Sequence, residues 1–399
     1  MTAPLLSVDE ARRRLNALMP AMAAETVALD EAAGRVLAAD AVAGRAQPPF
    51  AASAMDGYAV RAAEAVAGAR LRVAGEAAAG HAWAGRLPEG AAVRIFTGAP
   101  VPEGADAILI QEDAEREGDT VTVREAPGPG AYLRPAGGDF AAGFRLEAPR
   151  RLGPREVALL AAMGHDRVSV ARRPVVALVA TGDELVAPGA RPRPDQVFAS
   201  NDRGLSVRLA MTGARVVRTS IAADDRASLI GALGEARAAG ADVVVTLGGA
   251  SVGEHDLVAA AFGDAGLSLG FHRIAMRPGK PLMAGRLPGG AAMIGLPGNP
   301  VSAMVCGEIF AVPAIERALG LPGAPARRRP VALAEGIEAN GPREHYARAR
   351  LDAEGRAVLA ANQDSSLLTV LAEADGLVVR APRAPAAAAG EAVEFIDLP

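Results

Sequence analysis

The chain has 399 residues, half of them apolar, which is enough for two to four domains with cores of their own. A formal net charge of -4, with no basic block interleaved with aromatic residues, argues against a nucleic-acid-binding surface. A single cysteine, no apolar run of about 20 residues and no signal-peptide pattern exclude a disulfide framework and a membrane span and favour the cytoplasm.

The first segment predicts a helical domain that is interrupted by a β-rich insertion. A helical pattern runs from Val8 to about Asp40, with Ser7 as its cap, and two prolines at 48 and 49 end it. A helix predicted over 157–163 is expected to pack back on this N-terminal helix. Between them, Gly and Pro turns separate four short strands, at 69–75, 91–96, 107–111 and 120–125. The expected domains are a helical one over 1–44 and 141–172, and an inserted one over 45–140.

From residue 173 the pattern changes to strands that alternate with helices. The apolar run 175–180 is typical of a strand covered on both faces. The other expected elements are a helix at 200–212, a strand at 214–220, a helix at 225–239, strands at 242–247 and 291–294, and a helix at 301–315. This alternation predicts a doubly wound, mostly parallel α/β domain over 173–322.

The last segment, 323–399, alternates on a period of two and predicts a small β-barrel-like domain. Its strands are expected at 331–333, 345–351, 376–379 and 393–396. The Ala- and Pro-rich tract 381–390 reads as a loop without chemistry. The fold class is therefore α/β and multidomain.

Three loops are expected where parallel strands end, which is where open α/β sheets bind ligands: 181–184, 248–256 and 297–302. The glycines of 248–253 allow close backbone approach and outward N–H groups, as a phosphate site needs. The spacing is neither that of a P-loop nor that of the dinucleotide fingerprint. A tight strand-to-helix turn is the alternative.

The third loop and the helix after it provide two further side chains. Ser302, in the predicted first turn, suits an anion at the positive end of the helix. Cys306, one turn further on, is expected to be a buried structural thiol.

Carboxylates gather at the same strand ends. Beside a phosphate they would need a bridging cation, usually Mg²⁺, and the alternative is that they are caps and solvated turn residues. Asp225 fits a helix cap. The set is Asp183, Glu184, Asp224, Asp225 and Asp256.

Lys280 is the single lysine among 42 basic residues, and it lies between prolines in Arg277-Pro278-Gly279-Lys280-Pro281. Such a stiff loop would hold a compact ammonium in place, as an oxyanion site requires, whereas a solvated loop is the alternative. The five histidines have no spacing that suggests zinc ligands.

Six motifs in this order resemble the MoeA family of molybdopterin molybdenumtransferases, which includes the C-terminal part of gephyrin. They cover most of the chain, from about Asp40 to Val378. The motifs are Ser53-Ala54-Met55-Asp56-Gly57-Tyr58-Ala59-Val60, Thr97 to Asp106, Thr181-Gly182-Asp183-Glu184-Leu185, Gly248 to Asp256, Arg277 to Pro281, and Leu296 to Ser302.

The resemblance implies an elongated four-domain homodimer that inserts molybdenum from molybdate into adenylylated molybdopterin, with Mg²⁺ and release of AMP. It also implies contact with the upstream adenylyltransferase and with downstream molybdoenzyme chaperones. The implied catalytic residues are Asp56, Thr97, Glu184, Asp224, Asp256 and Lys280. The metal would be held by Glu184, Asp224 and Asp256. The expected substrate-binding residues are Arg134, Gly248, Gly249, Ser251, Gly253, Arg277, Pro281, Pro297, Gly298, Asn299, Ser302, Arg348 and Ser365.

In this hypothesis the glycine loop holds pterin or pyrophosphate oxygens, and a cationic cup holds molybdate: Arg277, Lys280, Arg348 and Ser365. Asp56 and Thr97 would reach the same cleft from the partner subunit. Many relatives carry Lys where this chain has Arg277. Two alternatives are a pterin adenylyltransferase, against which the inserted and terminal domains argue, and a non-catalytic scaffold, against which Lys280 and the acidic set argue.

Overall fold

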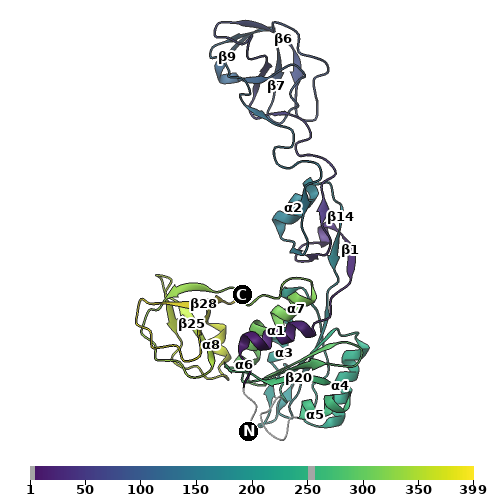
Figure 1. Cartoon of the computed structure of the whole chain (residues 1–399), viewed down its shortest axis with the longest axis vertical. Coiled ribbons are helices and arrows are strands. Elements are labelled where there is room, and N and C mark those ends of the chain that lie inside the picture. Colours follow the sequence, from purple (N-terminus) through teal and green to yellow (C-terminus); the bar gives the residue numbers. More distant parts are fainter. Residues whose placement is uncertain (1–4, 250–256) are drawn as a thin grey trace.

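The computed structural model describes residues 5–249 and 257–399 and shows an elongated molecule. At one end lies an α/β domain with the C-terminal strands beside it, and at the other a separate β lobe, joined by a narrow middle region (Figure 1). Within the described residues, no helix has the length and apolar character needed to cross a membrane.

The N-terminal helix is shorter than predicted. Helix α1 is Val8–Leu18, and the hydroxyl of Ser7 caps it by accepting from the Glu10 backbone N–H (3.2 Å). The helix ends there because Pro20 follows, which disfavours helical backbone at Met19. The expected helix to Asp40 is therefore wrong beyond Leu18. Helix α1 buries its apolar face in the core of the α/β domain, against α7 (Val312–Ala318).

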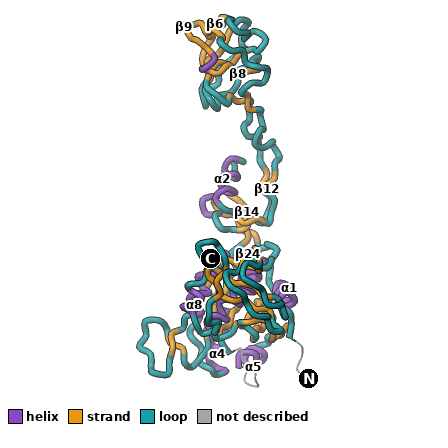
Figure 2. Tube along the Cα trace, turned by 90° about the vertical axis from the view of Figure 1, so that its left-hand side faces the viewer, coloured by secondary structure: helices purple, strands orange, loops and turns teal. Residues whose placement is uncertain are grey.

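The middle region is a small sheet with one helix rather than a helical domain. Its strands have the order β1-β14-β2-β13 and are β1 (Ala24–Ala28), β14 (Arg167–Ala171), β2 (Val36–Leu37) and β13 (Arg150–Arg151). Helix α2 (Pro154–Ala162) packs on the 3-10 turn Leu29–Glu31 and on Leu152, not on α1 as predicted. The paired strands β3 (Ala41–Val42) and β12 (Arg145–Leu146) lead to the β lobe (Figure 2).

The inserted lobe is built on a six-stranded sheet of order β8-β5-β7-β6-β10-β9. The strands are β5 (Gly57–Val60), β6 (Arg70–Ala77), β7 (Ala91–Ile95), β8 (Ala107–Ile110), β9 (Ala114–Glu117) and β10 (Thr120–Val123). Two short strands, β4 (Ala52–Ser53) and β11 (Leu133–Arg134), pair beside it. The four predicted strands are confirmed. The segment 57–60, part of the first of the six motifs, is the buried strand β5, and a Cβ on Gly57 would lie 2.1 Å from the carbonyl oxygen of Leu109.

The α/β domain has the predicted doubly wound sheet, with an antiparallel addition. The sheet order is β18-β15-β19-β23-β22-β20, in which the first four strands are parallel, β22 runs antiparallel to β23, and β20 runs antiparallel to β22. The strands are β15 (Val175–Ala180), β18 (Arg215–Arg218), β19 (Val243–Leu247), β20 (Ser268–Arg273), β22 (Pro281–Arg286) and β23 (Ala292–Leu296). The short strands β16 (Leu185–Val186) and β17 (Val197–Phe198) pair at its edge.

Helices cover both faces of this sheet, and each face has its own apolar core. They are α3 (Asn201–Thr212), α4 (Arg226–Ala238), α5 (Leu257–Asp264), α6 (Pro300–Cys306) and α7. The predicted helix 301–315 is confirmed as α6 and α7, joined by a π-helical turn at Gly307–Ala311. The wider turn precedes Pro313, whose ring and missing N–H do not fit a regular α-helix.

The C-terminal strands form a sheet of order β21-β25-β27-β28-β24 around a small core. They are β21 (Met276–Arg277), β24 (Arg329–Ala332), β25 (Glu344–Leu351), β26 (Ala357–Leu359), β27 (Gly376–Arg380) and β28 (Ala392–Asp397), with helix α8 (Leu368–Ala372). Strand β26 pairs with β25, and a bridge from Leu333 to Ala357 brings the far edge back to it. These pairings agree with the predicted barrel-like domain.

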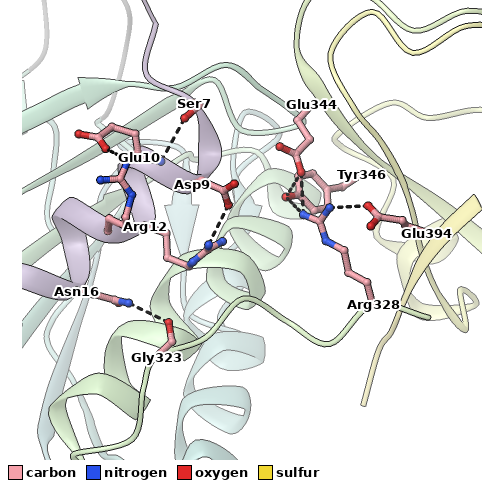
Figure 3. A network of polar contacts seen from close by, with 11 residues as sticks. Ser7, Asp9, Glu10, Arg12, Asn16, Gly323, Arg328, Glu344, Tyr346 and Glu394 are labelled. Carbon is pink, nitrogen blue, oxygen red and sulfur yellow. Dashed lines mark hydrogen bonds and ion pairs between the residues drawn. The ribbon is translucent and has the colours of Figure 1, made fainter. Parts of the chain in front are cut away.

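Hydrogen bonds and ion pairs hold both ends of the segment that links the α/β domain to the C-terminal strands (Figure 3). Asn16 of α1 donates to the carbonyl of Gly323 (2.9 Å). Arg328 then binds Glu344 (2.9 Å) and Glu394 (2.6 Å) of the C-terminal sheet. The C-terminal strands are thus held beside the α/β domain.

Candidate functional site

A cavity of about 500 Å³ lies where the parallel strands of the α/β domain end. The chain leaves β15 for β18 on one side and returns to β19 on the other, so β15 and β19 flank the point at which the strand order reverses. Many of the predicted site residues line this cavity. They are Glu184, Asp224, Gly248, Gly249, Pro281, Pro297, Gly298, Asn299 and Ser302.

The two described glycines of the phosphate loop need to be glycine. Gly248 and Gly249 have φ of 100° and 66°. A Cβ on Gly248 would lie 2.6 Å from the carbonyl oxygen of Thr181, and one on Gly249 would lie 2.3 Å from Val258. The missing side chains therefore let the backbone pack closely against Thr181 and Val258 at the cavity wall. Ser251, Gly253 and Asp256 lie outside the described residues.

The carboxylates at these strand ends differ in role: Asp225 is a helix cap, whereas Asp224 and Glu184 line the cavity. Asp225 caps α4 by accepting from the N–H and hydroxyl of Ser228 (2.8 and 2.7 Å), contacts that also lower its pKa. Its predicted capping role is confirmed. Asp224 accepts from the Thr181 hydroxyl (2.9 Å) and lines the cavity, as does Glu184.

These carboxylates fit a magnesium ion only if the substrate shares it. Among residues 5–249 and 257–399, no three acidic, His or Cys side chains lie close enough to bind a metal ion by themselves. Magnesium, however, is commonly held by one or two carboxylates together with substrate phosphates. Asp224 and Glu184, both on the cavity wall, meet that need.

Asp202 is a cavity residue that the sequence interpretation missed. It is in the first turn of α3, 7% exposed, next to Arg203 (3.4 Å) and Arg218 (3.9 Å). An acidic residue in the first turn of a helix is expected to interact with the helix dipole, so the sequence pattern did not indicate that Asp202 is buried.

The loop that carries Lys280 is fixed by contact with α6. Gly279 has φ of 105°, and a Cβ there would lie 2.2 Å from the Cys306 sulfur. Cys306 is fully buried and burial raises its thiol pKa, which is consistent with the predicted structural role. Lys280 is half-buried and forms no ion pair within the described part of the chain. Lys280 does not itself line the cavity, whereas its neighbour Pro281 does.

Arg348 and Ser365 of the C-terminal domain are linked to the cavity through one loop. Asn299, on the cavity wall, donates to the Ser365 hydroxyl (2.8 Å). Arg348 donates from Nη2 to the carbonyl of Asp364 (3.1 Å). Ser365 therefore contacts the cavity wall, whereas Arg348 does not line this cavity.

The Arg348 side chain is a buried cation with unused donors. It has no exposed surface, and its Nε and Nη1 have no acceptor among the residues that the structure describes. Burial lowers its pKa, Asp364 opposes that shift and Arg277 adds to it. A buried guanidinium that lacks a counter-charge is costly unless an anion completes it.

Asp56, Thr97 and Arg134 lie in the inserted lobe, at the far end of the chain from the cavity (Figure 1). Asp56 accepts from the N–H and the hydroxyl of Thr97, both at 2.8 Å, and these bonds lower its pKa. Arg94, missed from the sequence, stacks on the ring of Phe96 beside them. The lobe therefore has a preformed carboxylate, which its own chain does not bring to the cavity.

Three protein-family models match successive regions of this chain. They are the MoeA N-terminal region (domain I and II) at 6–164, a probable molybdopterin binding domain at 177–317, and the MoeA C-terminal region (domain IV) at 330–398. The chain belongs to the MoeA family. It is 38% identical to molybdopterin molybdenumtransferase 2 of Mycobacterium tuberculosis, over 98% of this chain and 99% of that one.

Other relatives agree with this membership. A molybdopterin molybdenumtransferase of Haemophilus influenzae is 38% identical over 75% of this chain and 74% of its own. A crystal structure of a MoeA molybdopterin biosynthesis protein from Pyrococcus horikosii superimposes with a TM-score of 0.84 at 30% identity, over 99% of both chains. The predicted family is confirmed, and its N- and C-terminal regions distinguish this chain from the smaller adenylyltransferase alternative.

Proposed function

We propose that this MoeA-family chain transfers molybdenum from molybdate to adenylylated molybdopterin and releases AMP. The observation that carries the proposal is Arg348, a fully buried guanidinium with two nitrogens that lack an acceptor. It is joined through the loop of Asp364 and Ser365 to a cavity of about 500 Å³. A buried anion position beside a larger ligand cavity is what a reaction between molybdate and a pterin nucleotide needs.

Two different sets of residues in this chain would bind the two substrates. The Gly248–Gly249 backbone approaches phosphate oxygens in the cavity, and Asn299 orients the Ser365 hydroxyl toward the anion. Lys280 and Arg348 supply positive charge to molybdate, a dianion. Arg277 adds charge from the same loop as Lys280, where its planar fork replaces the ammonium of many relatives.

Asp224 and Glu184 would hold Mg²⁺, together with Asp256, which lies outside the described residues. When bound, the ion neutralises the charge of the phosphoanhydride and of the leaving AMP. The Thr181 hydroxyl fixes one Asp224 oxygen, so the carboxylate keeps a single orientation. Contacts with an upstream adenylyltransferase and downstream chaperones, and a cytoplasmic location, stay predictions.

The direct test is purified protein with adenylylated molybdopterin, molybdate and Mg²⁺, followed by AMP release. We expect molybdate-dependent AMP formation in the wild type. Asp224→Asn is expected to lower the rate about 100-fold because the metal-binding charge is lost. Lys280→Ala should raise the molybdate concentration needed for half-maximal rate about tenfold or more.

A matched control is Arg350→Ala, which removes an exposed arginine from the same domain. It should behave as wild type in both respects. AMP release that does not depend on molybdate, or no AMP and no molybdenum retained on the pterin, would contradict the proposed transfer.

We further propose that the active form is a homodimer in which Asp56 and Thr97 act on the partner's cavity. Within one chain these residues lie in the lobe at the opposite end of the molecule (Figure 1). Yet Thr97 of the same lobe orients the Asp56 carboxylate and lowers its pKa, so the group is ready to act on a site outside its own lobe. A twofold arrangement of elongated chains would place each lobe on the other cavity.

Mixed dimers test this arrangement. A dimer of one Asp56→Asn chain and one Asp224→Asn chain, purified with two different tags, contains one intact site if Asp56 acts in trans. We then expect about half the wild-type rate, although each variant alone is nearly inactive. A mixed dimer as inactive as its parents, or a monomer at micromolar concentration, would refute the shared site.

A further inference from the structure

Arg94 of the inserted lobe contacts both segments that form the Asp56–Thr97 pair. It lies on β7, in register with Tyr58 of β5, and its guanidinium carbon is 5.1 Å from the centroid of the Tyr58 ring. The same carbon is 4.8 Å from the centroid of the Phe96 ring. Tyr58 follows Asp56 by two residues, and Phe96 directly precedes Thr97. One side chain therefore packs on the segment of each partner.

The nitrogens of Arg94 also hold the backbone next to Asp56. Nη1 donates to the carbonyl of Gly57 (3.2 Å), and Nη2 donates to the side-chain oxygen of Gln111 (3.0 Å). Gln111 in turn donates its backbone N–H to the carbonyl of Asp56 (3.1 Å). The planar fork of arginine presents its donors in a fixed geometry. The carbonyls of residues 56 and 57 are thus both held through contacts that include Arg94.

The carboxylate of Asp56 is held by Thr97. Its Oδ1 accepts from the N–H and from the hydroxyl of Thr97, at 2.8 Å each. These two bonds lower the pKa of Asp56, and the positive charge of Arg94 lowers it further. The pair nevertheless lies at the surface of the lobe, where Thr97 is exposed and Asp56 is half-buried. Contacts open to water hold a side chain only weakly in one orientation, so the pair needs support from its neighbours.

Such support matters because Asp56 is proposed to act at the partner's cavity. Its orientation then has to exist before the lobe and the cavity meet. Misplacement of a reacting group by about 1 Å can lower a rate about 100-fold. Functional side chains are held accurately when neighbouring side chains fix them on strands rather than on loops. Arg94 provides that link, since it joins the turn of Asp56 to strand β7.

We propose that Arg94 is a positioning residue for Asp56. Its fork and its two ring contacts fix the Asp56–Thr97 pair in the orientation that is used at the partner's cavity. Arg94 acts through the carboxylate and does not itself bind the substrate. This inference rests on the proposed transferase function and on the action of Asp56 in trans.

The alternative is that Arg94 only stabilises the lobe. Contacts between arginine and aromatic rings are common in proteins, and most have no link to a functional group. A purely structural arginine would stabilise the strands of the lobe in general. A positioning residue would instead change the Asp56–Thr97 pair selectively, and it would change activity only through Asp56.

The first test is hydrogen–deuterium exchange of the full chain, without substrate or turnover. The Thr97 amide reports directly, because it donates to Asp56. In Arg94→Met, which has a long side chain without donors, we expect this amide to exchange about tenfold faster. The amides of β6 and β10 should exchange as in the wild type. Unchanged exchange at Thr97, or an equal rise throughout the lobe, would overturn the proposal.

Gln111→Ala removes the same support from its other end. It takes away the acceptor of Arg94 Nη2, and since Gln111 is exposed the lobe should fold normally. Exchange at Thr97 should rise by a smaller factor, and the double variant should match Arg94→Met. Arg86→Met is the matched control, because Arg86 is an exposed arginine of the same lobe that donates to Glu103 (3.3 Å). It should leave exchange at Thr97 unchanged.

The second test is a double-mutant cycle on AMP release, measured at high enzyme concentration. Arg94→Met alone should lower the rate about tenfold to 100-fold. Added to Asp56→Asn, it should lower the remaining rate no further, because Arg94 acts only through that carboxylate. Losses that multiply in the double variant would show an independent role and would contradict the proposal.

The inference and the proposed function fail in different measurements. A wild-type protein that forms no AMP would contradict the transferase function, while exchange at Thr97 would still decide the role of Arg94. Conversely, a wild type that forms AMP and an Arg94→Met variant with unchanged Thr97 exchange would refute the positioning role alone.

Discussion

Arg348→Met is expected to abolish molybdate capture at the cup while the protein stays at least as stable as the wild type. The guanidinium is fully buried, and two of its nitrogens have no acceptor among the described residues. Methionine has a similar length and no charge to leave unpaired, so the free energy of unfolding should be unchanged or rise by about 1 kcal/mol. Molybdate affinity should fall about 100-fold or more because the buried charge is lost.

Arg208→Met is the contrasting variant. Arg208 is partly buried and donates two hydrogen bonds to the Glu308 carboxylate, from Nε (2.6 Å) and from Nη2 (2.9 Å). Glu308 is only 8% exposed. Its removal leaves a buried carboxylate alone, which should destabilise the fold by about 3–5 kcal/mol. Urea unfolding and molybdate binding, measured for both variants, distinguish an anion-binding role of Arg348 from a structural one. If Arg348→Met loses as much stability as Arg208→Met, Arg348 is a structural residue rather than an anion ligand.

Gly279→Ala is expected to lower both stability and molybdate affinity, through a clash with Cys306. The added Cβ would lie 2.2 Å from the buried sulfur, at a residue whose φ of 105° disfavours any side chain. We expect a loss of about 2–4 kcal/mol in the free energy of unfolding. The loop must shift to relieve the clash, and a shift of about 1 Å at Lys280 can cost about 100-fold in function.

A double-mutant cycle isolates that contact. In Gly279→Ala with Cys306→Ala the sulfur is gone, and the next atoms near the Cβ are 3.9 Å away or more. Part of the loss should return, by about 1 kcal/mol, while the backbone strain remains. Gly234→Ala, in helix α4 with open space around it, should leave molybdate affinity unchanged and raise the free energy of unfolding by about 0.5–1 kcal/mol, the usual gain for Gly→Ala in a helix. Additive effects of the two substitutions would show that Cys306 does not hold the Lys280 loop.

Local patterns were sufficient where an element is governed by its own residues. The apolar run 175–180 became β15, an inner strand of the sheet, and the alternation after residue 173 became a doubly wound sheet. The glycines after β19 lie at the cavity as predicted, because the carboxyl ends of parallel strands meet at one edge. Asp225 was recognised as a cap because capping depends on only three neighbouring residues.

Patterns failed where distant residues decide the structure. The stretch from 24 to 37 has a helical apolar spacing, yet it forms β1 and β2 because β14 and β13 supply their partners. Segment 57–60 has turn-like composition, and it is a strand because β7 and β8 pair with it on both sides. Helix α2 packs within the middle sheet and not on α1, a choice made by tertiary contacts alone.

The sequence by itself determined the chemistry of this protein: a glycine loop, carboxylates at strand ends, a single lysine between prolines, and six motifs in family order. Those are properties of residue type and short spacing. Only the tertiary structure decided that Arg348 is buried with unused donors, that Asp202 lines the cavity, and that Arg94 contacts the rings of Tyr58 and Phe96 beside Asp56. Burial and cross-strand register depend on contacts between residues far apart in the chain, which no local pattern contains.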